Sequence, residues 1–308
     1  MSKPDELLSD LLAWGHGLKG FKREHASEAL HGGSLFLMGV EDKYGRMIQG
    51  VGTQNKQADH AFILDMAMLF WLDDCFDEQI LEQHELDAVG EVLSGKSRAS
   101  TVEAERYLAL LDLLAAQARS DADFALVREY GATYYRALQA EAHLSSGKRE
   151  MSYVEYLENG IDSIAFMRVL ASLSALWGLD MSVRRECPRF LRFLRHLCLV
   201  GRLQNDLHSL GKDQREACAA NAVVVVERFL PGAPALAFVE EELRGYERLL
   251  DKDMEDLALD DPFRRLAEIF RRMRELYYST SRERYQTAQH DAIGQRGLSG
   301  KSRLRNGY

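Results

Sequence analysis

Helical periodicity dominates this chain and most restricts the folds that it can adopt. Only five prolines occur in 308 residues, and the alternating pattern of a half-buried strand is nearly absent. The one strand-like run, AVVVVERF, lies within a helical neighbourhood. Clusters of Gly, Ser and Pro predict breaks between helices. We expect an all-α protein with a single domain over residues 1–290 and a flexible, polar tail over residues 291–308.

Composition and charge narrow the class of protein. The net charge is −9, so the chain is a poor general binder of nucleic acid or anionic membrane. The four cysteines form no CxxC pair, and the charged N-terminus has no signal-peptide core. No apolar run approaches the roughly 20 residues that span a bilayer. These features predict a reduced, soluble, cytoplasmic protein without nucleic-acid binding or stable membrane insertion.

The stretch FILDMAMLFWLDDCFDE (62–78) carries two carboxylates on an apolar helix face. Successive helix residues turn by about 100°, which places Asp73 and Asp77 on the stripe of Phe62, Met66 and Leu69. A buried carboxylate is costly unless it is paired or binds a cation. Two carboxylates one turn apart also repel each other, so this register indicates a cation site.

The stretch NDLHSLGKD (205–213) has the same character. Its oxygen-bearing side chains Asn205, Ser209 and Asp213 extend the apolar stripe of Leu194 and Cys198. They climb about 12 Å along the helix at a rise of ~1.5 Å per residue. The spacing predicts a second row of oxygen ligands that points into the protein.

A third helical stretch, residues 263–285, places Arg284 at the polar end of its apolar face, and Tyr285 follows directly. The combined ligands are hard oxygen donors, which suit Mg²⁺ or Mn²⁺ rather than zinc. Mg²⁺ in such sites takes further ligands from a substrate phosphate. Arg284 and Lys212 would then donate hydrogen bonds to that phosphate.

Each pattern alone has an ordinary explanation. A DDxxD string is more often a solvated helix face, the Asn/Ser string can be an exposed amphipathic turn, and an Arg-Tyr pair is a common surface feature. All three occur here in inward register, which favours the metal site. The strings GHGLKG (15–20) and GEVLSGKS (90–97) match GxGxxG and GxxxxGK[ST], but neither follows a strand-like run, and no GxSxG string occurs.

At these residues the sequence resembles the class I terpene synthases, and the resemblance spans residues 73–285. That family has a DDxxD motif, an N-D-x-x-S-x-x-x-E motif and a C-terminal Arg-Tyr pair. Shorter stretches, LFWLDDC, YLENGIDSIA, LWGLD and GRLQNDLH, are similar to the bacterial ent-kaurene synthases of gibberellin biosynthesis. The matching motif residues are Asp73, Asp74, Asp77, Asn205, Asp206, Ser209, Asp213, Arg284 and Tyr285.

The sequence departs from the family pattern at two places. Asp213 stands where the family usually has Glu, one methylene longer. Many bacterial members carry a diphosphate-sensing Arg at the position of Asn159, which can still donate a hydrogen bond but has no charge. Asp162 and Ser163 fall where the linker and effector residues of that family would be. The usual sensing switch is therefore in doubt.

The resemblance implies an α-helical bundle with a central cavity and three Mg²⁺ ions, replaceable by Mn²⁺, that bridge the diphosphate of a prenyl substrate. Lys212, Arg284, Tyr285 and Asn159 would contact the diphosphate. Aromatic faces would stabilise the resulting cation. Residues with an expected place at the cavity are Phe70, Tyr156, Ser163, Ala165, Phe166 and Tyr277.

The implied reaction converts ent-copalyl diphosphate to ent-kaurene and diphosphate. No Asp-x-Asp-Asp string for a class II cyclisation occurs, so a class II copalyl diphosphate synthase would supply the substrate. A homodimer is compatible with this interpretation. The alternatives are another diterpene or sesquiterpene product, a chain-elongating prenyltransferase, or a non-catalytic helical binding protein. A prenyltransferase normally has a second DDxxD, which is missing here.

Overall fold

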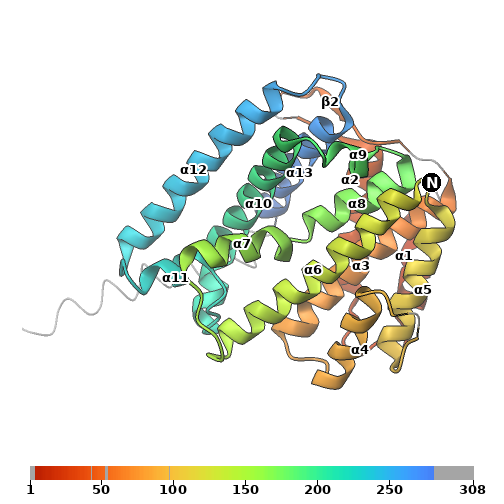
Figure 1. The fold of residues 1–308 in the computed structure, drawn as a ribbon, viewed down its shortest axis with the longest axis horizontal. Helices are drawn as coiled ribbons and strands as arrows, with labels where there is room; N and C mark the ends of the chain where they lie inside the picture. Colours follow the sequence, from red (N-terminus) through yellow and green to blue (C-terminus); the bar gives the residue numbers. More distant parts are fainter. Residues whose placement is uncertain (1–3, 43, 53–54, 97, 281–308) are drawn as a thin grey trace, which may run out of the picture.

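The computed structural model describes residues 4–42, 44–52, 55–96 and 98–280, with side chains over 5–276 within these ranges. These residues are almost entirely helical, which confirms the all-α prediction (Figure 1). The helices are α1 (Pro4–Gly15), α2 (Arg23–Met38), α3 (Lys56–Asp77), α4 (Gln83–Leu93), α5 (Val102–Gln117), α6 (Asp121–Ser145), α7 (Tyr153–Ser163), α8 (Phe166–Trp177), α9 (Met181–Arg184), α10 (Pro188–Arg215), α11 (Ala222–Glu227), α12 (Ala233–Glu255) and α13 (Pro262–Thr280). The predicted domain end at residue 290 and the predicted tail lie outside the described residues.

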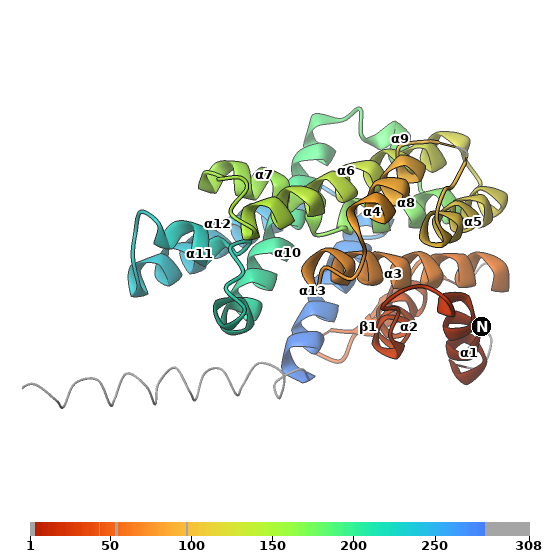
Figure 2. The ribbon, with the colours of Figure 1, turned by 90° about the horizontal axis from the view of Figure 1, so that it is seen from below.

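Two helices organise the bundle. The central helix α3 packs against α2, α5, α6 and α8, and most of its side chains are buried. The long helix α10 packs against α12, α7, α11 and α13, on the other side of the molecule in Figure 1. Helix α13 joins the two halves because it contacts both α2 and α10 (Figure 2). The bundle thus holds the two motif-bearing helices in one core.

A short antiparallel hairpin lies within a predicted break between helices. Strands β1 (Gly39–Glu41) and β2 (Met47–Gln49) pair with Val40 opposite Ile48. Gly39 has φ 99°, and a Cβ there would meet the Ile48 carbonyl oxygen at 2.1 Å. Only glycine fits this close approach. Because each strand has three residues, no alternating pattern marks it in the sequence.

The strand-like AVVVV run forms helix α11. Asn221 caps this helix by accepting a hydrogen bond from the Val223 amide. Val223, Val225 and Val226 are buried against α7, α10 and α12. Tertiary burial therefore overrides the weak helix propensity of valine at this point.

The segment Tyr153–Trp177 is long and apolar enough to cross a membrane by length and composition alone, so the expectation of no such run is corrected here. The segment is broken between α7 and α8, where Ala165 has a left-handed φ of 59°. The protein itself buries 78% of the apolar window. A core position accounts for its composition.

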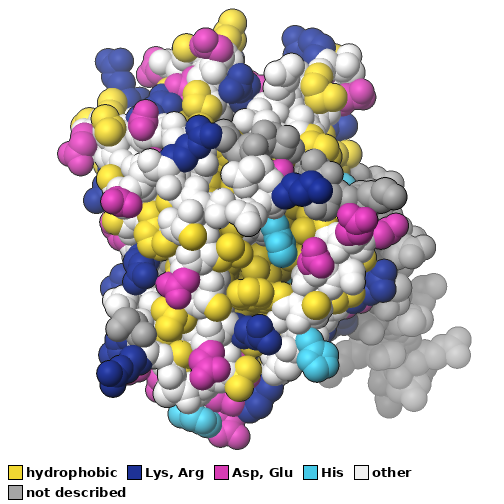
Figure 3. Space-filling model, turned by 90° about the vertical axis from the view of Figure 1, so that its right-hand side faces the viewer, with side chains coloured by type: hydrophobic (Ala, Val, Ile, Leu, Met, Phe, Trp, Pro, Cys, Tyr) yellow, Lys and Arg dark blue, Asp and Glu magenta, His cyan; other side chains and the backbone are white. Residues whose placement is uncertain are grey.

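One face of the molecule carries mixed charge. On the face seen in Figure 3, Lys and Arg side chains are dispersed among Asp and Glu, and hydrophobic side chains gather near the middle. No broad basic region interrupts this face. The mixed charge of this face agrees with a chain whose net charge is −9.

Candidate active site

The first acidic motif lies at the C-terminal end of α3. Burial raises the pKa of Asp73 well above its usual range, and the carboxylates of Asp77, Glu141 and Asp74 raise it further. Arg202 opposes this shift. The ionised form of Asp73 therefore has too little positive charge nearby to balance it. This is the situation that we expect for a carboxylate on an inward-facing helix side.

Asp77 lies one turn further along α3, where its side chain keeps access to solvent. Burial by surrounding groups nevertheless raises its pKa to about 6. Lys212 lowers this pKa, whereas Glu141 and Asp213 raise it. Because Lys212 and Asp213 belong to α10, these interactions indicate that the ends of the two motif helices lie near each other.

Asp74, between these two residues, points to a different partner. Its Oδ2 atom lies 2.9 Å from His25 Nε2 and 3.2 Å from Lys22 Nζ, both at the start of α2. Lys22 also pairs with Glu78 at 2.6 Å. Burial alone would raise the pKa of Asp74, but the hydrogen bonds from His25 and Lys22 hold it below its ordinary value. Asp74 therefore anchors α3 to α2.

The second motif forms a row of mutually bonded side chains on α10. Ser209 donates to Asp213 Oδ2 at 2.5 Å, and Asn221 Nδ2 donates to the same oxygen at 2.8 Å. Asn221 also donates to the Asp206 carbonyl oxygen at 2.7 Å. Asn205 Oδ1 accepts a longer hydrogen bond of 3.4 Å from Arg274. These contacts hold the three proposed α10 ligands in defined orientations.

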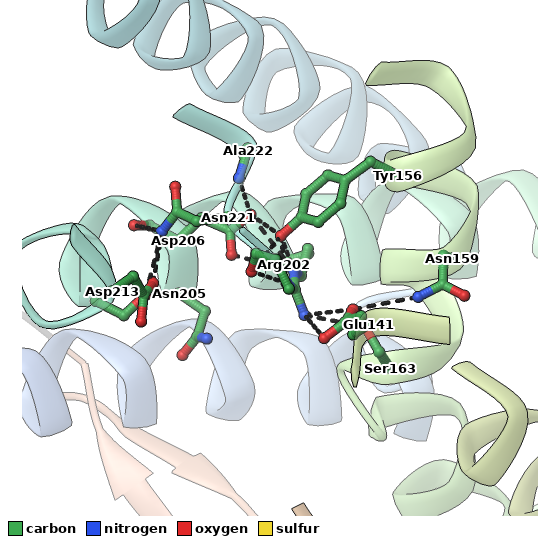
Figure 4. A network of polar contacts seen from close by, with 12 residues as sticks. Glu141, Tyr156, Asn159, Ser163, Arg202, Asn205, Asp206, Asp213, Asn221 and Ala222 are labelled. Atoms are coloured by element: carbon green, nitrogen blue, oxygen red, sulfur yellow. Dashed lines mark hydrogen bonds and ion pairs between the residues drawn. The ribbon is translucent and has the colours of Figure 1, made fainter. Parts of the chain in front are cut away.

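A buried arginine lies beside this row (Figure 4). Arg202 Nη1 is 3.0 Å from Glu141 Oε1 on α6, and its Nε is 3.1 Å from Asp206 Oδ1. It also donates to Ser163 Oγ at 3.0 Å and to the Tyr156 hydroxyl at 3.0 Å. Burial opposes its charge, but Asp206 and Glu141 keep the pKa of Arg202 well above its ordinary value. One guanidinium thus ties α10 to α6 and α7.

Asn159 joins the same network through a shared acceptor. Its Nδ2 donates to Glu141 Oε1 at 3.2 Å and to the Ala137 carbonyl oxygen at 3.1 Å. Glu141 is also the carboxylate that pairs with Arg202 (Figure 4). The cation in this network is therefore Arg202 of α10, and Asn159 of α7 binds the same carboxylate without adding a charge.

The donor chemistry fits a divalent metal ion. Within the described residues, no three acidic, histidine or cysteine side chains form a compact metal-binding cluster. Carboxylate, amide and hydroxyl oxygens lie instead in two groups, or half-sites, on α3 and α10, and Asp77 of the first group interacts electrostatically with Asp213 of the second. Burial and, to a smaller extent, neighbouring carboxylates raise the pKa values of Asp73 and Asp77, and a dication between the two groups would offset both effects. Such an open oxygen site suits a metal that also binds a phosphate.

A family model described as "Terpene synthase family 2, C-terminal metal binding" matches residues 66–241, more than half of the chain and both metal half-sites. The chain belongs to the terpene synthase family. The chain is therefore a terpene synthase of a metal-binding family, and this family uses prenyl diphosphates.

Solved structures show the same fold. The 2-methylisoborneol synthase from Streptomyces coelicolor A3(2) has a TM-score of 0.71 at 14% identity, over 92% of this chain and 91% of that chain. Linalool/nerolidol synthase from Streptomyces clavuligerus gives 0.69 at 14% identity, over 90% and 99%. Abietadiene synthase from Abies grandis gives 0.68 at 19% identity, over 89% of this chain and 37% of that chain. The predicted class I terpene synthase bundle is confirmed.

The structure of this terpene synthase shows the burial and the contacts of most of the predicted cavity residues. Tyr156 is fully buried and its hydroxyl donates to Asp206 Oδ2 at 2.9 Å. Phe166 is buried at the start of α8, and Phe70 is half-buried against the core. Ser163 and Ala165 lie at the break between α7 and α8. Tyr156 and Ser163 thus contact the Arg202 network directly.

Three predicted site residues cannot be placed in this way. The side chain of Tyr277 and both residues of the Arg284-Tyr285 pair lie outside the described part of the chain. Lys212 is described: its side chain is half-exposed, and its Nζ lies 3.8 Å from Glu216. Lys212 therefore remains accessible to a ligand.

Sequence reasoning missed several residues of this terpene synthase. Arg202 carried a usable signal, because it precedes Asn205 by three residues and so lies about 60° from it on the helix. Glu141, Asn221 and Arg274 come from other helices or loops. Their roles depend on tertiary contacts that no local pattern encodes.

Proposed function

We propose that this terpene synthase is a class I enzyme that ionises a prenyl diphosphate at the ends of α3 and α10. The observation that supports this most directly is the group of carboxylates with raised pKa values, Asp73 and Asp77, opposite Lys212 and Asp213. The proposed metal ligands are Asp73, Asp77, Asn205, Ser209 and Asp213. We expect Asp213 to serve despite its shorter side chain, because Ser209 and Asn221 already orient it.

The proposed chemistry separates a diphosphate from an allylic carbon. Magnesium ions, three by family resemblance and replaceable by manganese, would supply most of the positive charge that the departing diphosphate requires. Lys212 and, by resemblance, Arg284, Tyr285 and Asn159 would donate hydrogen bonds to the same group. Release of the diphosphate leaves a carbocation in the bundle interior.

After ionisation, the protein interior keeps water away from the carbocation and determines the conformation in which it reacts. The α3 face below Asp73 is lined by buried Met66 and Leu69. Aromatic faces near α8 can stabilise a cation by about 0.5–2 kcal/mol each. A final proton loss gives the alkene, and the released diphosphate is a candidate base.

We propose ent-copalyl diphosphate as substrate and ent-kaurene as product. The support is the similarity of four short stretches to bacterial ent-kaurene synthases and the lack of a class II Asp-x-Asp-Asp string. A class II copalyl diphosphate synthase would then act one step earlier in gibberellin biosynthesis. We place the enzyme in the cytoplasm, and a homodimer is compatible with this proposal.

The test supplies purified protein with MgCl₂ and one substrate at a time: geranyl, farnesyl, geranylgeranyl or ent-copalyl diphosphate. Gas chromatography with mass spectrometry then identifies the hydrocarbons. We expect ent-kaurene from ent-copalyl diphosphate alone. A product from another substrate would keep the terpene synthase assignment and overturn the specificity. Chain elongation of dimethylallyl with isopentenyl diphosphate would instead indicate a prenyltransferase.

A further inference from the structure

Arg274 on α13 contacts the metal motif from outside it. Its Nη2 atom donates to Asn205 Oδ1 at 3.4 Å, and Asn205 is the first proposed ligand on α10. The guanidinium also stands over the ring of Phe270, one turn earlier on α13, at 5.4 Å from the ring centroid. Arg274 therefore connects a proposed metal ligand to an aromatic ring in the core.

That ring continues the connection to the break between α7 and α8. Phe270 stacks on Phe166 with ring centroids 3.8 Å apart. The stack fits against α10 because position 201 is glycine: a Cβ there would meet Phe270 Cε1 at 2.8 Å. Phe166 directly follows Ala165, the left-handed residue that interrupts the two helices. A continuous set of contacts thus runs from Asn205 to this break.

We propose that Arg274 is a positioning residue that makes metal binding at Asn205 depend on the diphosphate and relays it to the α7–α8 break. The inference rests on the proposed function. A donor on Asn205 Oδ1 competes with a cation for the same oxygen lone pairs. The guanidinium also repels a dication at short range. An anion that binds both charges removes this conflict.

Two other positions near this oxygen do not offer the same contact with Asn205. Arg202 is buried and holds Glu141 and Asp206 at 3.0 and 3.1 Å, so its charge is already balanced. Position 159 carries an amide without charge. Arg274 is half-buried, and its hydrogen bond to Asn205 is long at 3.4 Å and therefore weak.

The experiment measures binding without turnover. Wild-type protein and three variants are titrated by calorimetry with MgCl₂ alone, inorganic diphosphate alone, and MgCl₂ in saturating diphosphate. Arg274→Met keeps the length of the side chain and removes its charge, Arg274→Lys keeps the charge, and Arg271→Ala is the control. Arg271 lies on the same helix but pairs with Asp251 at 2.6 Å.

In wild-type protein we expect diphosphate to strengthen Mg²⁺ binding by about tenfold or more, a normal size for coupled sites. Arg274→Met should bind Mg²⁺ alone more tightly and lose most of this coupling. Arg274→Lys should retain part of it, and Arg271→Ala should match the wild type. Equal coupling in Arg274→Met and wild type would overturn the inference and leave the proposed function intact. A wild-type protein that binds neither MgCl₂ nor diphosphate would overturn both.

Hydrogen exchange tests the relay. Mg²⁺ with diphosphate should slow exchange at residues 160–168 of the wild type by several-fold. In Arg274→Met the protection of this segment should be lost, while α12 behaves as in the wild type. The same protection in both proteins would show that the α7–α8 break responds by another route and would refute the relay.

Discussion

Arg202 Nη1 lies 3.0 Å from Glu141 Oε1 in the interior, and this ion pair joins α10 to α6 beside both metal half-sites. The pair stands at the centre of the network that also contains Asn159 and Ser163. It therefore fixes α10, which carries one row of proposed ligands, relative to the helices that face it.

Removal of the Glu141 side chain should destabilise the fold. Glu141→Ala leaves the buried Arg202 charge with one carboxylate partner, and the loss of a buried partner costs about 3–5 kcal/mol. Urea denaturation measures the change in unfolding free energy. Glu141→Gln keeps an acceptor for both donors and should lose clearly less. An alanine variant as stable as the wild type would show that the pair does not support the fold.

Asp73 and Asp74 should respond in opposite ways to the loss of their charge. Asp73→Asn removes a carboxylate whose pKa is raised by burial, so the metal-free protein should unfold at the same or a higher temperature. Its turnover should fall on the order of 100-fold or more, because a metal ligand is lost. Asp74→Asn breaks contacts with His25 and Lys22 and should unfold at a lower temperature. Melting curves without metal provide the comparison, and equal shifts would contradict it.

Stability of the metal-free protein should depend on pH through Asp77. Its pKa is about 6 in the folded protein against an ordinary value of 3.8, so the folded state binds more protons between these values. The Asp77 contribution should therefore weaken the fold as pH rises from about 4 to about 6. Mg²⁺ competes with the proton, so its affinity should rise over the same range.

Melting temperature against pH, with EDTA or with MgCl₂, measures this effect. Other groups also titrate in this range, so the informative quantity is the difference between wild type and Asp77→Asn. In Asp77→Asn, the part of the stability loss between about pH 4 and about pH 6 that comes from Asp77 should be absent. The gain in Mg²⁺ affinity over the same pH range should be absent as well. Parallel curves for the two proteins would refute the assignment.

Asn221 should matter for both stability and metal binding. Its buried amide donates to Asp213 and to the Asp206 carbonyl, and its oxygen caps α11. Asn221→Ala should cost about 1–3 kcal/mol, because buried acceptors lose their donor. It should also weaken Mg²⁺ binding, since Asp213 is no longer held. Denaturation and calorimetry give the two values. Ser120→Ala, which removes a helix cap on α6 far from the site, should affect stability only.

The left-handed backbone at Ala165 should limit substitutions there. Ala165→Val places a β-branched residue at φ 59°, which should cost more than the ~1–2 kcal/mol that alanine already bears. Because the next residue, Phe166, stacks on Phe270, the product ratio should also change. Ala165→Gly relieves the backbone and should stay near wild type in both respects. A valine variant with unchanged melting and products would contradict this.

The inward direction of Asp213 could be predicted from the sequence, because the spacing of residues on a helix determines the side on which they lie. The same argument placed Asp77 on a buried face, and there it is wrong, since Asp77 is exposed at the end of α3. Asp73 falls on a buried stripe by its phase alone, and its surroundings in the structure agree. The different orientation of Asp74 follows from the same rotation of about 100°. Its partners do not, because Lys22 and His25 come from a segment about 50 residues away.

The remaining contacts depend on how helices meet. Glu141 belongs to an ordinary amphipathic helix, and only packing brings it to Arg202. The role of Asn221 requires the turn after α10, which directs its amide back to Asp213. The β-hairpin also escaped prediction, since three-residue strands are shorter than the pattern that identifies them.

The contacts of Lys22 and His25 with Asp74 also bear on where this molecule could be shortened. Residues 66–241 identify the family, yet α2 lies before this region and α13 lies after it. A fragment trimmed to these limits would keep both ligand rows while losing the cations that hold Asp74 and the helix that bears Arg274. Chimaeric proteins built from two related synthases should therefore exchange α2 and α13 together with the central helices.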